Sequence, residues 1–279
     1  MAEAGPDRET LRRVVRQHAD TARSMGVDFV PCFRTGVVVE PKAAGVVEED
    51  SAAVAAPAKA PEPVKAAESF SEDERAARQA RLDEIRARYE ADAPHKDFDT
   101  EFTNIVFGEG DPCARLMFIG EAPGAEEDKT GRPFVGRAGQ LLEKMIIAMG
   151  LSRETVYIAN LLKTRPPNNR TPTPDEVRAC APYLYEQVRV IRPAAIVTLG
   201  APASKLLLET DQGIGKLRGT WATFPPATAL VAVEDVPETP VMPTYHPAFL
   251  LRSYTDENRR KVWSDLRQVM DRLGLTAAG

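Results

Sequence analysis

The stretch Arg115-Leu116-Met117-Phe118-Ile119-Gly120-Glu121-Ala122-Pro123-Gly124 decides the fold of this chain. Its apolar half predicts a buried strand, and its glycine-bounded half predicts a tight loop at the carboxyl end of that strand. Two further apolar runs end in the same way, 156–159 at Asn160 and 240–244 shortly before His246. Because ligands of an open parallel sheet bind beyond the carboxyl ends of its strands, we expect Glu121, Asn160 and His246 to meet at one rim.

Helical patterns lie between the predicted strands. Apolar residues recur at helical spacing in Gly136–Met149, and 173–176 combines an N-cap threonine, a proline in the first turn and a capping-box glutamate. A further apolar run, Ala194–Leu199, predicts another strand, and Thr220–Glu238 predicts a loose hairpin insertion. Strands that alternate with helices indicate an α/β fold, with a parallel sheet covered by helices on both faces.

The bulk composition fits one medium-sized domain with an N-terminal extension. The chain has 279 residues, of which 43% are hydrophobic, and a formal net charge of −5. We expect residues 1–27 to form an amphipathic helix, 28–70 a disordered Ala/Pro-rich linker, 71–97 a helical lead-in, and 98–279 the main domain. The N-terminal helix could dock on the core or bind an unknown protein partner.

The composition also narrows the cellular setting. No apolar run is long enough for a transmembrane helix, and the charged N-terminus lacks the apolar region of a signal peptide. The three cysteines, Cys32, Cys113 and Cys180, are odd in number and far apart, which argues against a disulfide framework and suits a reducing cytosol. We therefore expect a cytoplasmic monomer that does not bind membranes.

Five motifs in a fixed order carry a resemblance to a known family. They are GEAPGAEEDKTGRPFVGRAGQLL (120–142), YIANLLKTRPPNNRTPTPDE (157–176), IVTLGAPA (196–203), GIGKLRG (213–219) and MPTYHPAFLLR (242–252). From about residue 106 to residue 273, the chain resembles the family 4 uracil-DNA glycosylases of the uracil-DNA glycosylase superfamily. The resemblance implies a three-layer α/β/α fold around a central four-stranded parallel sheet, with 98–279 as the catalytic domain.

The resemblance assigns catalytic and substrate-binding roles to the rim residues. Glu121 would orient the attacking water and stabilise the cationic sugar, and His246 would hydrogen-bond uracil O2 as uracil leaves as an anion. Phe134 would stack on the flipped base. The Asn160 carboxamide offers one donor and one acceptor, which match uracil O4 and N3–H. The remaining substrate-binding residues would be Gly120 and Ala122.

A structural alternative stands beside each of these roles. Glu121 could cap a loop amide, Phe134 could be a core side chain, and Asn160 could form a turn. Asp128, in the acidic run that follows the first motif, is expected to cap a helix and is a second catalytic candidate. His95 has no motif around it, and we expect it to lie on the surface.

DNA binding requires basic residues, because phosphate neutralisation supplies most of the non-specific affinity. The charges of 98–279 nearly cancel, so we expect a local basic rim. An apolar residue after His246 could wedge into the duplex as the base leaves, or it could begin the packing of the last helix. The residues expected to contact DNA are Lys163, Arg165, Arg170, Arg218, Leu250, Leu251 and Arg252.

The chain departs from the family at its iron–sulfur cluster. The resemblance implies four cysteine ligands: a C-x2-C pair before the Val-Phe-Gly that opens the core, one after the lysine of Lys-x-Arg-Pro-Pro, and one in the next helix. Here 91–103 contains no cysteine, Thr164 stands at the third position, and only Cys180 remains. Such a cluster needs about four thiolates, so we expect that this chain holds no cluster, no metal and no other cofactor.

The loops that a cluster would tie must then be held by packing. We expect Phe98, Phe102 and the helical segment Ser71–Arg88 to pack against the helix that contains Cys180. Cys180 itself lies on the apolar face of that helix and is expected to act as a small core residue.

The leading functional expectation is an enzyme. The chain would be a uracil-DNA glycosylase that flips uracil out of DNA and hydrolyses its N-glycosidic bond, which leaves an abasic site and starts base-excision repair. The alternative is a degenerate, non-catalytic member of the superfamily that binds uracil-containing DNA. Loss of cluster ligands favours that alternative, and retention of Glu121, Asn160 and His246 opposes it. A third possibility is a related hydrolase that acts on another damaged base or a nucleotide.

Overall fold

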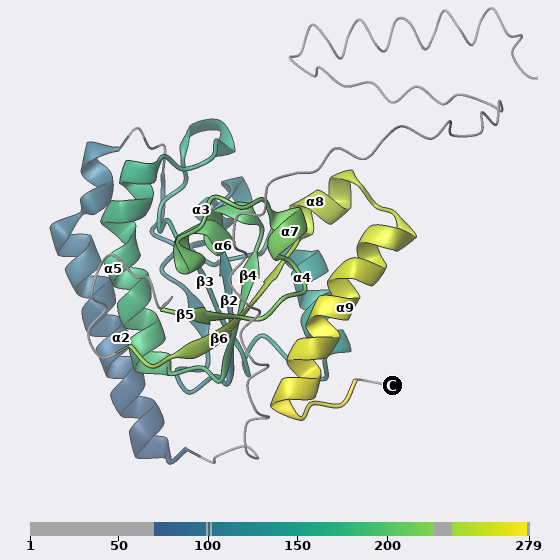
Figure 1. Ribbon diagram of the computed structural model, residues 1–279. Coiled ribbons are helices and arrows are strands. Elements are labelled where there is room, and N and C mark those ends of the chain that lie inside the picture. The colour runs from purple at the N-terminus through teal and green to yellow at the C-terminus, as the bar shows by residue number, and fades with distance from the viewer. Residues whose placement is uncertain (1–69, 99, 101, 226–235, 278–279) are drawn as a thin grey trace, which may run out of the picture. The chain divides into compact units, whose positions relative to one another are not determined.

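The computed structural model describes residues 70–98, 100, 102–225 and 236–277. A sheet in the order β1-β3-β2-β4-β6-β5 forms its centre, and helices flank it (Figure 1). The strands are β1 (Glu109–Gly110), β2 (Leu116–Gly120), β3 (Tyr157–Asn160), β4 (Ala195–Leu199), β5 (Ala222–Phe224) and β6 (Thr239–Thr244). The helix and linker that we expected within 1–69 lie outside the described residues.

Helices connect these strands, and short 3₁₀ turns occur in two of the loops. The longer helices are α2 (Glu72–Asp92), α4 (Arg137–Ala148), α5 (Pro174–Ile191), α6 (Ala201–Leu208) and α9 (Asp256–Leu273). The shorter elements are η1 (Pro94–Asp97), α3 (Ala125–Thr130), η2 (Pro167–Asn169), α7 (Ile214–Leu217) and α8 (Pro247–Arg252). Within the described ranges, none of these helices has the length and apolar character needed to cross a membrane.

The sheet confirms the predicted parallel core and adds an edge strand on each side. The central strands β3, β2, β4 and β6 pair in parallel, as expected. The edge strands β1 and β5 pair antiparallel with β3 and β6, so the sheet is mixed and has six strands rather than four. β5 lies within the predicted hairpin insertion and pairs antiparallel with β6, and residues 226–235 of that insertion lie outside the described residues. A two-residue strand such as β1 is too short to leave an alternating pattern in the sequence.

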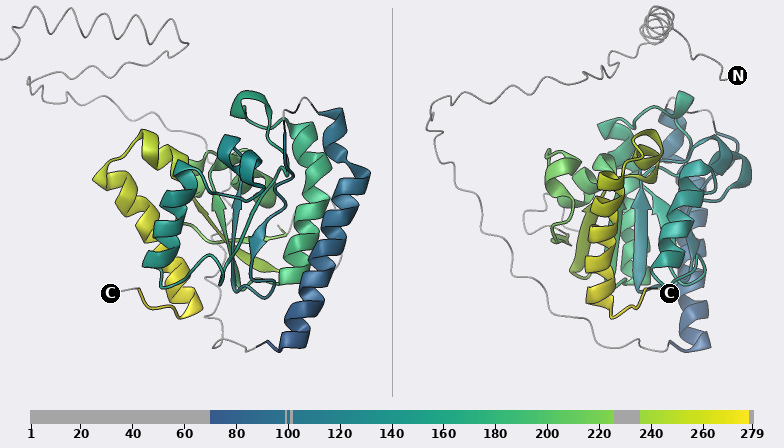
Figure 2. Two further views of the ribbon diagram at one scale, coloured as in Figure 1. Left: turned by 180° about the vertical axis from the view of Figure 1, so that it is seen from behind. Right: turned by 90° about the vertical axis from the view of Figure 1, so that its right-hand side faces the viewer.

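Two helical layers enclose the sheet, which confirms the three-layer α/β/α fold. Successive strand residues point to opposite faces. In β2, Met117 and Ile119 pack in the core formed with α2, α5 and α6, whereas Leu116 and Phe118 pack in the core formed with α4, α8 and α9. Figure 2 shows these helical layers on either side of the strands.

The parallel register brings the chemical groups to one edge of the sheet. Pairing of β2 with β3 aligns Gly120 with Asn160. The ladder continues past both strands, where the Leu162 amide donates to the Glu121 carbonyl at 3.1 Å. β6 runs parallel to β4 and ends just before His246. The three polar residues therefore leave the sheet at the same rim, as the sequence predicted.

The helix starts follow from local side-chain caps. The Ser71 hydroxyl accepts from the Glu74 amide at 3.1 Å and begins α2. In α5 the Thr173 hydroxyl accepts from the Glu176 amide, while the Glu176 carboxylate accepts from the Thr173 amide at 2.7 Å. This reciprocal pair is the predicted capping box. It fixes where α5 begins and therefore where the proline-rich loop before it must end.

Candidate active site

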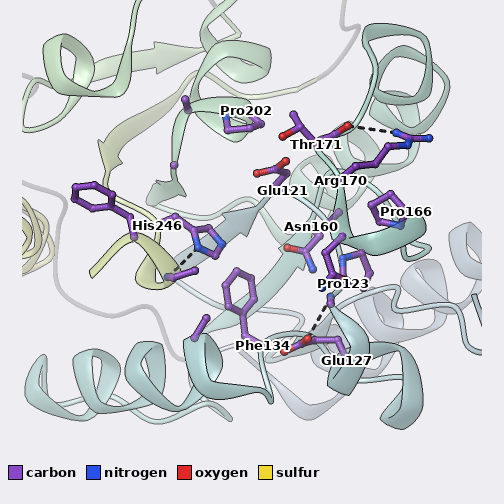
Figure 3. A pocket seen from close by; sticks show the side chains of 18 of the residues that line it. Glu121, Pro123, Glu127, Phe134, Asn160, Pro166, Arg170, Thr171, Pro202 and His246 are labelled. Carbon is purple, nitrogen blue, oxygen red and sulfur yellow. Dashed lines mark hydrogen bonds between the residues drawn. The ribbon is translucent and has the colours of Figure 1, made fainter. Parts of the chain in front are cut away.

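A pocket of about 590 Å³ opens at the carboxyl end of the parallel strands (Figure 3). Its walls come from the loop after β2, the end of β3 and the proline-rich loop beyond it, the turn after β4, and the junction of β6 with α8. Glu121, Phe134, Asn160 and His246 all line it. The structure therefore brings together Phe134, Asn160 and His246, which were expected to contact the base, and Glu121, which was expected to act on the water and the sugar.

The floor of the pocket depends on a glycine. A Cβ atom built on Gly120 would lie 2.4 Å from both Asn160 Oδ1 and Phe134 Cζ, far inside contact distance. Glycine at this position therefore lets the carboxamide and the aromatic ring come together over the end of β2. Ala122 lines the pocket two residues later. Gly120 itself is not among the residues that line the pocket, and it acts by leaving space for Asn160 and Phe134.

Asn160 presents an unsatisfied acceptor to this pocket. It is the last residue of β3, and its side chain is 1% exposed. Within the described part of the chain, Oδ1 accepts no hydrogen bond. A buried polar atom without a partner costs about 1–3 kcal/mol, so this arrangement suits a ligand that supplies the missing donor. Figure 3 shows the carboxamide between the loop after β2 and Phe134.

Phe134 is held in a conformation that is uncommon for a bulky side chain. Its φ is 52°, in the left-handed region. The Arg153 guanidinium supports it by donating to the carbonyls of Pro133 at 2.6 Å and Phe134 at 2.9 Å, and it also pairs with Glu109. Arg153 lies outside the quoted motifs, in the loop after α4, so no pattern in the sequence pointed to it.

Glu127 ties the two halves of the first motif together. Its carboxylate accepts from the amides of Val135 and Gly136, both at 2.8 Å, and from the Gly124 amide at 3.2 Å. The neighbouring Asp128 is buried and accepts from two backbone amides of the segment before β1. Asp128 is not part of the pocket lining, so it is better explained as a structural residue than as a second catalytic group.

His246 has its tautomer fixed by the start of α8. Nδ1 accepts from the Ala248 amide at 3.0 Å, so the proton of the neutral ring resides on Nε2. Burial, together with the positive charge of Arg252, lowers the pKa of His246 to about 4. Gly200, with φ 91°, makes room for the ring, because a Cβ there would lie 3.1 Å from the His246 Cβ. The pocket thus holds a neutral imidazole whose Nε2–H remains available to a ligand.

Glu121 is half-buried on the opposite wall. Burial raises the pKa of its carboxyl group, while a hydrogen bond with the Thr171 side chain and the charge of Arg252 act in the other direction. Thr171 belongs to the proline-rich loop, which Arg170 anchors through two hydrogen bonds of 2.6 and 2.8 Å to the Glu176 carboxylate. Thr171 lies inside the second motif, but the sequence did not predict a role for it.

The structure corrects the role predicted for Lys163. Its side chain is fully buried, and Nζ donates to the Asn160 carbonyl at 2.9 Å and to Gln187 Oε1 at 2.7 Å. Burial lowers the pKa of Lys163 to about 7. A lysine enclosed in this way cannot reach a DNA phosphate. The prediction was wrong because a basic residue in a motif loop was assumed to be exposed.

Two more expected DNA contacts are engaged within the protein: Leu250 is buried, and the partly exposed Arg218 is paired with a carboxylate. Leu250 is 2% exposed and packs in the core between α4 and α9. Arg218 pairs with the buried Asp265, whose carboxylate also accepts from the Thr244 hydroxyl at 2.6 Å. Arg218 therefore braces the end of β6, and the prediction of a DNA contact does not hold for Leu250 or for Arg218 in this conformation.

The other expected DNA contacts remain accessible. Leu251 is 37% exposed, and Arg252 beside it is also exposed and lines the pocket. Arg165 is partly exposed and donates to Asn169 Oδ1 at 2.8 Å. Arg170 also lines the pocket while it pairs with Glu176. Of the two leucines, only Leu251 is exposed.

The side chains around Cys180 do not fit a four-iron, four-sulfur cluster. Cys180 Sγ lies 4.0 Å from the Tyr89 hydroxyl, and Tyr89 also forms a side-chain hydrogen bond with Thr164. His95 is not on the surface as expected, because it is 5% exposed and stacks on the Tyr89 ring. Across the described ranges, no group of three or more His, Cys, Asp or Glu residues could hold a metal ion.

Comparison with known proteins identifies the family. The family model for the uracil DNA glycosylase superfamily matches residues 107–267. The chain belongs to this superfamily. It is 46% identical over 168 residues to a type-4 uracil-DNA glycosylase of Thermotoga maritima, a match that covers 60% of this chain and 82% of that protein.

Two further relatives extend this result. A type-4 uracil-DNA glycosylase of Saccharolobus solfataricus is 45% identical over 175 residues, which is 61% of this chain and 76% of the relative. A type-4 uracil-DNA glycosylase of Archaeoglobus fulgidus is 41% identical over 172 residues, which is 62% of this chain and 83% of that relative. These matches confirm the resemblance drawn from the motifs.

Proposed function

We propose that this superfamily member is a uracil-DNA glycosylase, which flips uracil out of DNA and hydrolyses its N-glycosidic bond to leave an abasic site. Relatives named type-4 uracil-DNA glycosylases, at 41–46% identity, support the proposal. The observation that carries it is the buried Asn160 carboxamide, whose Oδ1 has no partner among the described residues, in a pocket that also contains Phe134 and His246.

Recognition of the base follows from the groups on the pocket floor. Uracil would stack on the Phe134 ring and present its polar edge to Asn160. Oδ1 would accept from N3–H, and Nδ2 would donate to O4. Cytosine offers the reverse pattern at these two positions, which would leave buried groups unpaired. A site built to bond a polar edge discriminates strongly against such a mismatch.

His246 would stabilise the leaving base. Its Nε2–H is the nitrogen not engaged by the Ala248 amide, and it would donate to uracil O2. Negative charge grows on that oxygen as the N-glycosidic bond breaks. A fixed donor in a buried site acts most strongly on charge that develops in the transition state. Because the ring is neutral, the proton stays on Nε2 and the base leaves as an anion.

Glu121 would act on the sugar side of the bond. In its ionised form, the carboxylate can accept a hydrogen bond from water and orient it towards the anomeric carbon. The same charge would stabilise the cationic sugar. Thr171 would fix the carboxylate through its hydrogen bond, and Arg252 would hold an adjacent phosphate. Leu251 is the proposed wedge that fills the space left by the flipped base.

One assay tests the activity. The protein is incubated with an end-labelled oligonucleotide that contains a single uracil, and abasic sites are detected by strand cleavage in alkali. The same oligonucleotide with thymine in place of uracil is the substrate control. We expect strand cleavage only with uracil, and we expect His246→Ala and Glu121→Ala to slow uracil release far more than they weaken DNA binding. Binding of uracil-containing DNA without any abasic product would favour the non-catalytic alternative instead.

Several expectations from the sequence remain predictions. They are the monomeric state, the cytoplasmic location, the lack of an iron–sulfur cluster or other cofactor, and an unknown protein partner for residues 1–27. The retained pocket residues Glu121, Phe134, Asn160 and His246 favour catalysis over a degenerate DNA-binding role.

A further inference from the structure

A buried group of aromatic rings joins α2, η1 and α5. We call Tyr89, His95, Phe102 and Tyr183 the aromatic cluster. The Tyr89 ring is fully buried, stacks with His95 at 5.5 Å between centroids and meets the edge of Tyr183 at 5.0 Å. Phe102 closes the group with an edge contact to His95 at 4.7 Å. Such edge and stacked pairs stabilise beyond the apolar area that they bury.

The hydroxyl of Tyr89 contacts both Cys180 and Thr164. It is 4.0 Å from Cys180 Sγ and forms a side-chain hydrogen bond with Thr164. These are the two positions beside the proline-rich loop at which the family resemblance places cluster cysteines. Thr164 precedes the loop, and Cys180 lies in the helix that follows it. A single side chain from α2 therefore joins both ends of the loop.

The ends of this loop are connected to the active site. Lys163, next to Thr164, donates to the carbonyl of Asn160 at 2.9 Å. Further along, the loop carries Thr171 to the Glu121 carboxylate. A displacement of the loop start would thus be transmitted to the group proposed to read the base, and a displacement of its middle would be transmitted to the group proposed to orient water.

Neighbouring contacts hold the aromatic cluster against the rest of the fold. The Tyr183 hydroxyl donates to Asp92 at the end of α2 at 2.6 Å, and Arg88 lies over the Tyr183 ring. The Thr100 hydroxyl donates to the Arg165 carbonyl at 2.8 Å, which attaches the segment after η1 to the loop itself. α2 is therefore bound to α5 and to both sides of the loop.

We propose that the aromatic cluster, centred on Tyr89, replaces the family's iron–sulfur cluster as the tie of the proline-rich loop, and that Tyr89 is a positioning residue for Asn160 and Glu121. It touches neither the base nor the sugar. The kinetic part of the inference rests on the proposed glycosylase function, whereas the structural part concerns only the order of the loop.

The test compares Tyr89→Leu, which removes the ring, with Tyr89→Phe, which keeps it. Tyr185→Leu is the control, because Tyr185 lies on α5, as Tyr183 of the aromatic cluster does, but packs on Phe224 in β5. Three quantities are measured well below the melting temperature of each variant: the single-turnover rate of uracil release, DNA affinity, and amide hydrogen exchange by peptide.

We expect Tyr89→Leu to slow uracil release by at least about ten-fold, with DNA affinity little changed, because small misplacements of catalytic groups carry large rate penalties. Exchange should accelerate in 160–173 more than elsewhere. Tyr89→Phe keeps the ring contacts but loses the hydroxyl contacts to Cys180 and Thr164, so its rate and loop protection should lie between those of Tyr89→Leu and the wild type. Tyr185→Leu should lower the melting temperature and leave both readouts at their wild-type values.

Unchanged loop exchange in a folded Tyr89→Leu variant would overturn the proposal, whatever the activity. If that variant does not fold, Phe102→Leu at the margin of the aromatic cluster must show the same local exchange effect for the proposal to stand. A wild-type protein without glycosylase activity would refute the proposed function and leave the exchange result to decide the structural tie.

Discussion

The backbone amide of Ala248 donates a hydrogen bond of 3.0 Å to Nδ1 of His246. This single contact decides a question that the sequence leaves open, namely which form of the imidazole faces the substrate. A protonated Nδ1 would place two N–H donors against each other, so the contact favours the neutral ring, in agreement with a pKa lowered to about 4 by burial and by Arg252. The acid–base behaviour of the site must then come from Glu121.

The pH profile of uracil release should report Glu121 rather than His246. Burial raises the pKa of the Glu121 carboxyl above its ordinary value, and the proposed mechanism uses its ionised form. As pH falls, activity should therefore decline at a higher pH than the ordinary pKa of a glutamate side chain would give. Single-turnover rates measured from pH 4 to pH 9 check this, and Glu121→Gln should abolish the acid limb. A limb that persists in this variant would assign the titration to another group.

Asn160→Asp should change which base the pocket recognises, from uracil towards cytosine. Asp accepts hydrogen bonds but, when ionised, cannot donate to uracil O4, so release of uracil should fall by about two orders of magnitude. Some release of cytosine should appear, because the carboxylate accepts from the cytosine amino group. Release of both bases from matched oligonucleotides is measured by abasic-site formation. Unchanged uracil kinetics would remove Asn160 from the proposed base-reading role.

Leu250 and Leu251 form a matched pair that separates packing from DNA contact. Leu250→Ala should destabilise the fold by about 2–5 kcal/mol, because the side chain is buried between α4 and α9. Leu251→Ala should change stability little and should slow uracil release more in double-stranded than in single-stranded DNA. Denaturant unfolding and strand-specific rates check the two variants. Equal loss on both kinds of DNA would contradict the wedge.

A second pair of variants, at Arg252 and Lys163, tests which basic side chain contacts a DNA phosphate. Arg252→Ala should lower the salt dependence of DNA binding by about one unit of slope, as expected for loss of one phosphate contact. Lys163→Met should leave that slope unchanged, because the lysine is enclosed by protein. Affinities measured over a range of salt concentrations give both values. A reduced slope for Lys163→Met would mean that this side chain reaches DNA in the bound state.

Particular residues show how far the sequence could reach. The apolar runs that end in Gly120 and Asn160 correctly predicted two central strands and the rim at which they end. The burial of Lys163 and His95 could not be predicted in this way, because it depends on contacts between distant segments. Lys163 meets Gln187 of α5, and His95 stacks on the Tyr89 ring, which in turn meets Tyr183 of α5. Motif membership alone does not distinguish a basic residue that faces solvent from one that supports the strand beneath it.

Arg153 illustrates a second limit. It supports the left-handed backbone of Phe134 from a loop that carries no motif. The need for such support appears only once the φ of Phe134 is known. The same holds for the choice between Leu250 and Leu251, because a six-residue helix has no clear apolar period and its orientation is set by the neighbouring α4 and α9.

The last prediction concerns iron. The purified protein should be colourless and contain no stoichiometric iron when prepared anaerobically, since the chain has three cysteines and a cubane cluster takes about four thiolates. Cys180→Ser should cost only about 1–2 kcal/mol of stability and leave uracil release intact, because Sγ meets the Tyr89 hydroxyl in a packed interior. Iron content, visible absorption and denaturant unfolding check these points. A brown protein with about four irons per chain, lost on mutation of Cys180, would contradict both this prediction and the replacement of the metal cluster by aromatic rings.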